Sequence, residues 1–323
     1  MNKSSYTAAS TLPIKVIINS EICKQVKNHN IKPIHIQINP TNKCPLSCSF
    51  CSLSNRDKTK EMDLRELIDM TMKFKQLGTQ AITITGGGEP LAYYGINEYI
   101  NFCHNQGIKL GLVSNGVLIH NLDTNVIKKF TWIRISLSDE YKLLTDKLKT
   151  VISNTINDTD WSFSYVITHK LNMENIIKAI NFGNQVGLKH IRIVDDILSN
   201  EPSKMREIKN TIKSRNINDD IVIYQGRKSY RKGNKKCMIG LLKPNIDAEG
   251  YIYSCCGIQY ITKTPSRDFK KELSIGHIND IDRVWDNQII FDGSVCDRCY
   301  YDSYNELLNM CWDHDDIQHK EFL

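Results

Sequence analysis

The stretch CPLSCSFC, residues 44–51, places Cys44, Cys48 and Cys51 within eight residues. Such a group indicates either disulfides or a metal site. Eleven cysteines in 323 residues do not fit the small disulfide-stapled class of secreted proteins, which is usually under about 100 residues. The N-terminal segment MNKSSYTAASTLPIK has no apolar core of the kind that a secretory signal needs. We therefore expect a cytoplasmic, reducing location, in which clustered cysteines indicate metal.

The bulk composition is that of an ordinary globular protein, at 41% hydrophobic and 24% charged residues. The net charge of +6 permits an acidic partner but does not require one. No apolar run approaches the roughly 20 residues of a membrane span, so we expect no membrane partner.

Hydrophobic periodicity predicts strands that alternate with helices. In MDLRELIDMTMKFKQLG (62–78) the apolar residues share one helical face, and 96–107 and 173–187 are also typical of helices. Alternation of this kind implies a parallel sheet with right-handed crossovers, and hence an α/β fold with a partial (β/α)6 barrel similar to a TIM barrel. The predicted strands are residues 33–39, 81–85, 109–116, 132–138, 163–168 and 190–195.

The pattern changes after about residue 200, where strands become short and cysteines return. This change predicts a second, small cysteine-rich α+β domain. The expected organisation is an N-terminal extension at 1–32, a barrel at 33–215 and the small domain at 216–323.

Four unusual loops follow predicted strands. They are the cysteine loop, GGGEP (86–90), SNG (114–116) and SLSD (136–139). Loops after the carboxyl ends of barrel strands form the active face, so we expect these four to lie together.

The cysteine triplet permits two metal sites. A structural zinc would need a distant fourth ligand, since such zinc is usually four-coordinate. A [4Fe–4S] cluster bound by three thiolates would keep one iron free of protein ligands. Catalytic metal sites keep such an open coordination position for a reactant.

CPLSCSFC resembles the C-x3-C-x-aromatic-C signature of the radical S-adenosylmethionine (radical SAM) superfamily, with Phe50 as the aromatic. In that family a GGE motif follows the next strand, and Gly87, Gly88 and Glu89 occupy those positions here. Glycines allow a backbone to approach a ligand closely, here the methionine ammonium.

The resemblance implies that Cys44, Cys48 and Cys51 bind a [4Fe–4S] cluster whose open iron chelates S-adenosylmethionine. Reductive cleavage then gives a 5′-deoxyadenosyl radical that takes a hydrogen atom from substrate. Ser114, Asn115 and Ser136 stand where the family often contacts the cofactor. A plain turn and a satisfied strand hydroxyl are the alternatives for these three residues.

The second cysteine set begins with CMIGLLKPNIDAEGYIYSCC (237–256), in which DAEG between hydrophobic arms predicts a hairpin. It resembles the SPASM and twitch extensions of radical SAM enzymes, and GHINDIDRVWDN (276–287) resembles their linker. The single-cluster twitch arrangement, as in a radical SAM aminocyclitol dehydrogenase, implies a second auxiliary [4Fe–4S] cluster. Its ligands would be Cys237, Cys255, Cys296 and Cys299, and a zinc ion on the same four is the alternative.

A full SPASM domain holds two auxiliary clusters, and this chain departs from it because Asn305 stands at the C-x5-C position after Cys299. Cys256 and Cys311 are candidates to replace one ligand or to donate a hydrogen atom, while Cys103 is expected to be a buried apolar residue.

The run GRKSYRKGNKK (226–236) has six basic residues and suits either an acidic partner, nucleic acid included, or a solvated loop. It lacks the interleaved aromatics of a single-strand binder, so nucleic acid is the less favoured partner. His35 and His190 fall on strands and are expected to be structural.

These features predict a radical SAM enzyme that modifies a peptide or protein by epimerisation, crosslinking or oxidation, with a low-potential donor such as flavodoxin or ferredoxin. One alternative is a dehydrogenase or epimerase of a small molecule such as a sugar or aminocyclitol. A second is a non-enzymatic iron–sulfur sensor, against which TGGGEP argues.

Overall fold

The computed structural model describes residues 14–141, 144–196, 198–199, 202–226, 231–258 and 272–313. These residues divide into two compact units. The first contains residues 38–68 and 80–226, and the second contains residues 14–37, 69–79, 231–258 and 272–313.

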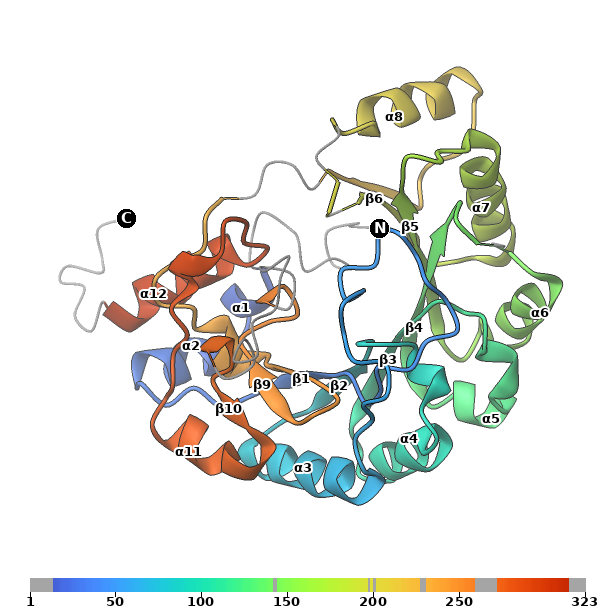
Figure 1. Cartoon of the computed structure of the whole chain (residues 1–323). Helices are drawn as coiled ribbons and strands as arrows, with labels where there is room; N and C mark the ends of the chain where they lie inside the picture. The colour runs from blue at the N-terminus through green and yellow to red at the C-terminus, as the bar shows by residue number, and fades with distance from the viewer. Residues whose placement is uncertain are drawn as a thin grey trace. The chain divides into compact units, whose positions relative to one another are not determined.

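The first unit is built on six parallel strands that pair in chain order, as a partial barrel requires. Figure 1 shows strands β3 to β6 in a curved row with helices α4 to α7 on its outer side. The strands are β2 (Ala81–Ile84), β3 (Lys109–Ser114), β4 (Phe130–Ser138), β5 (Asp160–Ile167), β6 (His190–Asp195) and β7 (Val222–Gln225).

Helices connect successive strands, with short 3-10 turns η2 (Pro90–Ala92) and η3 (Ile119–Asn121). Their apolar faces pack on one face of the sheet, where the fully buried side chains each contribute about 1.5–3 kcal/mol. Helix α7 ends at Gly187, which adopts φ +80° as left-handed C-terminal glycines do. The helices are α4 (Ile96–Asn105), α5 (Thr124–Ile127), α6 (Asp146–Thr155), α7 (Met173–Val186) and α8 (Met205–Ser214).

Strand β7 extends the sheet beyond the six predicted strands. It follows α8, whose Ile208 and Ile212 are one turn apart and fully buried. Its sequence, VIYQ, does not alternate between apolar and polar residues, and most of the strand is half-buried, which gives little periodic signal. The parallel sheet therefore continues past residue 200, where the sequence pattern changes.

Strand β1 (His35–Ile38) and helix α3 (Leu64–Leu77) each contain residues of both units. Within the first unit the Ile38 carbonyl accepts the N–H of Thr85 at 2.9 Å, so the residues that follow β1 start beside β2. The predicted first strand thus leads into the cysteine loop as expected.

The second unit has a small antiparallel sheet of β8 (Asn245–Ile246), β9 (Tyr251–Tyr253) and β10 (Gly276–His277). The predicted DAEG hairpin is confirmed: Asp247 Oδ1 accepts the N–H groups of Glu249 and Tyr251, and Gly250 has φ +84°. Helices and turns surround it: α1 (Ile14–Ile17), α2 (Ser20–Lys27), α9 (Ile239–Leu242), η5 (Ile278–Asp280), α11 (Ile281–Asp286), η6 (Gly293–Val295) and α12 (Asp302–Asp313).

In the described ranges of the chain, no helix combines the length and apolar character needed to cross a bilayer.

Candidate functional site

The three clustered cysteines lie on the irregular loop between β1 and α3, and each is half-buried. The loop folds on itself: the N–H of Cys51 donates to the carbonyl of Cys48 at 3.1 Å, and the N–H of Ser54 donates to that of Cys51 at 3.1 Å. One short segment of backbone therefore presents all three thiols.

Burial is the largest cause that raises the pKa of the Cys48 thiol to about 11, followed by Cys51, Cys44 and the carboxylate of Glu140. A thiol whose pKa is raised in this way stays protonated at neutral pH unless a cation stabilises its thiolate. The loop is thus suited to a positively charged metal group.

The GGGEP turn packs directly against the residues that precede Cys44. The N–H of Gly88 donates to the Thr41 carbonyl at 2.8 Å, and the N–H of Glu89 donates to that of Lys43 at 2.7 Å. A Cβ on Gly88 would stand 2.0 Å from the Lys43 carbonyl oxygen, and one on Gly87 would stand 2.1 Å from Asn42 Oδ1. Close packing against the residues before Cys44 therefore requires glycine at both positions, in addition to any close approach of a ligand.

Glu89 ties the end of β2 to the end of β3. Its side chain is 2% exposed, and Oε1 accepts the hydroxyl of Ser114 at 2.7 Å while Oε2 accepts the N–H of Asn115 at 2.7 Å. The N–H of Leu91 also donates to Oε1, at 3.1 Å. Burial raises the pKa of Glu89, and these three hydrogen bonds oppose that shift.

Asn115 connects this network to the cysteines, because its Nδ2 lies 3.7 Å from Cys44 Sγ. The structure thus brings together three of the four predicted loops: the cysteine loop, GGGEP and SNG. Ser114 is buried, and Phe50 is half-buried on the cysteine loop.

The residues that directly follow the fourth loop, SLSD, were not singled out from the sequence. The Tyr141 hydroxyl donates to the carbonyl of Ser136, and burial raises the Tyr141 pKa, followed by Cys48, Glu89 and Cys44. Tyr141 therefore stands beside the cysteine loop. Ser136 itself is half-buried on β4.

Arg56 and Glu140 are two more site residues that sequence reasoning missed. Arg56 Nη1 donates to Cys51 Sγ at 3.3 Å, and Glu140 Oε2 accepts the N–H of Ser49 at 2.8 Å. Arg56 lies in the polar run SNRDKTK (54–60), which is typical of a solvated loop, and this hid its role.

Two rows on the inner face of the partial barrel are polar. Phe163 stacks on Phe182 of α7 at 6.2 Å between ring centroids, so the odd-numbered residues of β5 face the helices. The even-numbered residues face inward, and such an interior suits a polar ligand better than the apolar layers of a closed barrel. One row across β4, β5 and β6 contains Arg134, Ser162 and His190, and the next contains Ser136, Ser164 and Arg192.

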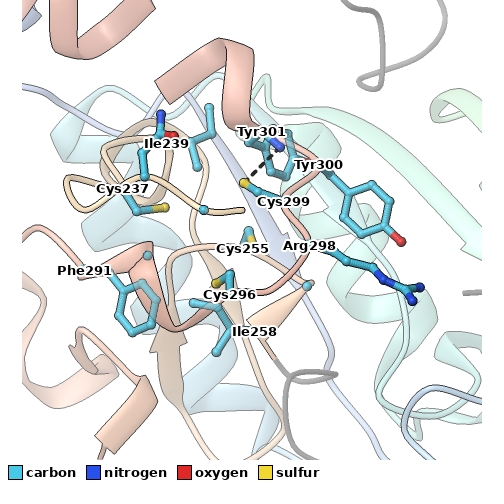
Figure 2. A pocket seen from close by; sticks show the side chains of 14 residues that line it. Cys237, Ile239, Cys255, Ile258, Phe291, Cys296, Arg298, Cys299, Tyr300 and Tyr301 are labelled. Carbon is cyan, nitrogen blue, oxygen red and sulfur yellow. Dashed lines mark hydrogen bonds between the residues drawn. The ribbon is translucent and has the colours of Figure 1, made fainter. Parts of the chain in front are cut away.

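The second unit gathers the other four predicted ligands around one cavity. Figure 2 shows Cys237, Cys255, Cys296 and Cys299 at its wall, with Phe291, Tyr300 and Tyr301 around them. Three separate segments supply these cysteines: the start of α9, the end of the β8–β9 hairpin and the residues that follow η6. The hairpin and the C-x2-C pair thus meet as the sequence predicted.

The four thiols influence one another. Burial raises the pKa of Cys237 to about 12, with Cys299 as the next cause, and burial and then Cys299 raise that of Cys296 to about 11. Burial also raises the pKa of Cys255 well above its usual range, and Cys256 and Cys237 add to that shift. A site of this kind is stable with ionised thiolates only when a cationic group is bound.

Asn305, which replaces a cysteine of the full SPASM pattern, is fully buried beside this cavity. Its Nδ2 donates to Cys237 Sγ at 3.5 Å and its Oδ1 accepts the N–H of Ile239 at 3.0 Å. The amide therefore orients Cys237.

The remaining cysteines lie outside the described lining of that cavity. Cys311 on α12 lies against Cys23 on α2; burial is the main cause that raises its pKa, and Cys23 adds to it. Cys103 is fully buried in α4, as expected for a small apolar residue. Cys256 is half-buried next to Cys255.

The basic run lies partly outside the described residues, since 227–230 are not covered. Arg231 forms ion pairs with Asp302 and Glu306, and Lys236 pairs with Asp313. These contacts agree with an exposed loop held by surface charges.

Thiolates are the donors that iron–sulfur clusters use, so both cysteine sets fit such groups chemically. Within the described parts of the chain, no three His, Cys, Asp or Glu side chains are placed to hold a single metal ion. The ligand assignments made from the sequence stay predictions.

Residues 38–142 match the family model described as the radical SAM superfamily. A GTP 3′,8-cyclase of Haemophilus ducreyi is 21% identical over 187 residues, which are 56% of this chain and 50% of that protein. The chain therefore matches only half the length of this relative. An uncharacterized protein of Methanocaldococcus jannaschii is 25% identical over 262 residues, or 74% of this chain and 84% of that one.

Among solved structures, SuiB of Streptococcus suis bound to its precursor peptide SuiA has a TM-score of 0.60 and 17% identity. The superposition covers 92% of this chain and 78% of SuiB. At this identity the likeness concerns the fold alone.

Proposed function

Residues 38–142 form a domain of the radical SAM superfamily, and on that premise we propose that the chain cleaves S-adenosylmethionine reductively and abstracts a hydrogen atom from a substrate. The observation that carries this proposal is the attachment of the cysteine loop to the GGGEP turn at the carboxyl ends of β1 and β2. A zinc site needs no such glycine turn beside it.

We assign roles to the residues of this site. Cys44, Cys48 and Cys51 hold a [4Fe–4S] cluster, which when bound supplies the electron for cleavage of the sulfonium. Gly87 and Gly88 offer backbone to the methionine end of the cofactor and let the turn reach the cysteine loop. Glu89 fixes the spacing between that turn and β3.

Ser114, Asn115, Ser136 and Phe50 complete the proposed cofactor site. Asn115 is the best placed of the four, because its side-chain amide already reaches Cys44 Sγ. Tyr141 covers the same loop and excludes water from it.

The second cysteine set is proposed to bind an auxiliary [4Fe–4S] cluster through Cys237, Cys255, Cys296 and Cys299. Four protein ligands leave no open iron, so this cluster would transfer electrons and not bind substrate. Flavodoxin or ferredoxin is the expected class of donor. Cys296→Ser should remove about four irons per chain and keep 5′-deoxyadenosine formation; an unchanged iron count with bound zinc would assign the site to zinc instead.

The preferred substrate is a peptide or protein, modified by an oxidoreductase or isomerase reaction. Support comes from the fold that the chain shares with SuiB, a protein solved with a precursor peptide bound. The polar inner face of β4 to β6 gives hydrogen-bonding groups for a backbone or for polar side chains.

A small polar molecule is the second candidate. One sequence relative is named for a reaction of GTP, and the inner rows contain Arg134 and Arg192, whose guanidinium groups suit anionic ligands. The sugar or aminocyclitol expected from the sequence belongs to the same class of small polar substrate.

The test is anaerobic reconstitution with iron and sulfide, followed by dithionite and S-adenosylmethionine, with 5′-deoxyadenosine as the product measured. Wild-type protein should release it slowly, and Cys48→Ser should release none. Cys23→Ser is the matched control, since Cys23 lies in the second unit outside both proposed sites. Panels of peptides, sugars and nucleotides then identify the substrate class by which of them accelerates release.

Absence of 5′-deoxyadenosine from wild-type protein with a full, reducible cluster would contradict the proposal. The iron–sulfur sensor would then be the better account.

A further inference from the structure

Arg56 is attached to the last cysteine of the triplet by its own side chain. Nη1 donates to Cys51 Sγ at 3.3 Å and to the Leu53 carbonyl, and Nε donates to the Asn42 carbonyl at 3.0 Å. The half-buried guanidinium therefore sits between the residues before and after the triplet, with one N–H directed at a ligand sulfur.

A negative group lies against the middle of the same loop. Glu140, from the loop after β4, accepts the N–H of Ser49 at 2.8 Å through Oε2 and the hydroxyl of Ser49 through Oε1. Ser49 directly follows Cys48, and the Glu140 carboxylate is one of the groups that influence the Cys48 thiol. Both side chains belong to the first unit.

We propose that Arg56 and Glu140 are positioning residues that set the reduction potential of the Cys44/Cys48/Cys51 cluster in opposite directions. Arg56 raises the potential, Glu140 lowers it, and both hold the loop in place. The inference rests on the proposed function, because it presumes that this triplet binds a [4Fe–4S] cluster.

The signs follow from charge. One electron from an external donor makes the cluster more negative by one unit, with no other bond formed or broken. A guanidinium N–H on a ligand sulfur stabilises the added charge, whereas a carboxylate beside the same loop opposes it. Hydrogen bonds to the sulfurs and local charge are among the factors that tune such clusters.

The two residues also differ in how far their effect should reach. Arg56 contacts a ligand atom directly, while Glu140 acts through the backbone N–H and hydroxyl of Ser49. Loss of Arg56 should therefore have the larger effect on the cluster.

The experiment is an EPR-monitored redox titration of the reconstituted full chain, following the reduced signal that changes when S-adenosylmethionine is added. At a fixed potential, Arg56→Gln should lower the ratio of reduced to oxidised cluster about tenfold, equivalent to about 59 mV for a one-electron couple. Glu140→Gln should raise the ratio, and it keeps an oxygen that can accept from Ser49. Arg56→Lys should lie between wild type and Arg56→Gln, because it keeps the charge.

Lys58→Gln is the matched control. Lys58 is an exposed cation on the same loop that donates to Ser47 Oγ at 3.3 Å. Its removal should leave the potential unchanged, because solvent screens an exposed charge. Iron release to a chelator gives a second readout, and Arg56→Gln should release iron faster than Lys58→Gln.

The inference is overturned if Arg56→Gln and Glu140→Gln shift the reduction potential in the same direction, or if neither shifts it. In that case a normal wild-type cluster leaves the proposed function standing. Wild-type protein that assembles no cluster on the triplet would instead overturn both.

Discussion

Replacement of Glu89 by alanine removes the acceptor that joins the GGGEP turn to the end of β3. The hydroxyl of Ser114 and the N–H of Asn115 would both lose their 2.7 Å partner in a buried site. Each buried donor left unsatisfied costs about 1–3 kcal/mol. Removal of a buried carboxylate also relieves its desolvation, so we expect a net loss of about 2–4 kcal/mol in the free energy of unfolding.

The assay is urea unfolding of the reconstituted protein under anaerobic conditions, with iron per chain measured on the same samples. Glu98→Ala, an exposed change in the first turn of α4, is the control and should stay within about 0.5 kcal/mol of wild type. Glu89→Gln should lose less than Glu89→Ala, because its amide oxygen still accepts one of the two donors. A loss for Glu89→Ala as small as that of Glu98→Ala would refute the reasoning.

Two further predictions concern backbone packing and pH. Gly88→Ala places a Cβ 2.0 Å from the backbone oxygen of Lys43, so the cysteine loop must shift. Reconstitution of this variant should therefore yield about four irons fewer per chain than wild type. A full iron content would contradict this prediction. Burial, with Arg134 and Arg192, lowers the pKa of His190 to about 3. The folded state thus keeps His190 neutral while the unfolded state is protonated below pH of about 6.5, and stability should fall by about 2.5 kcal/mol from about pH 7 to pH 4.5 on this account alone. His190→Gln should lose that much less in urea unfolding over the same interval, and equal losses would contradict the assignment.

The sequence predicted those features of the fold and site for which residue type and residue spacing point to the same structure. The parallel strands were predicted by alternation of strand and helix patterns, and the cysteine loop, GGGEP and SNG were expected to meet because carboxyl ends of parallel strands share one edge. The hairpin at 245–253 was predicted from DAEG between apolar arms. In each case the signal lies within a few neighbouring residues.

Contacts that depend on tertiary geometry were missed. Arg56 lies in a polar run that reads as solvent-exposed, and only folding of the loop directs its guanidinium to Cys51. Glu140 reaches Ser49 from 91 residues away along the chain. Strand β7 has the sequence VIYQ, in which apolar and polar residues do not alternate, so it carries no period-two signal.

The two polar rows inside the barrel are a related case. Arg134 and Arg192 each alternate with isoleucine on ordinary strands, so their pattern predicts only a face that is not packed by helices. The register shows that they occupy adjacent rows of the inner face. Sequence alone gives no register between distant strands, and so could not place them together.

The most direct test of the account is an EPR spectrum of the anaerobically reconstituted, dithionite-reduced protein with and without S-adenosylmethionine. We predict that the cofactor changes the g-values of one reduced [4Fe–4S] signal, and that Cys44→Ser abolishes that signal while Cys23→Ser leaves it. A reduced cluster whose spectrum is the same with and without S-adenosylmethionine would contradict the assignment of an open iron to this loop.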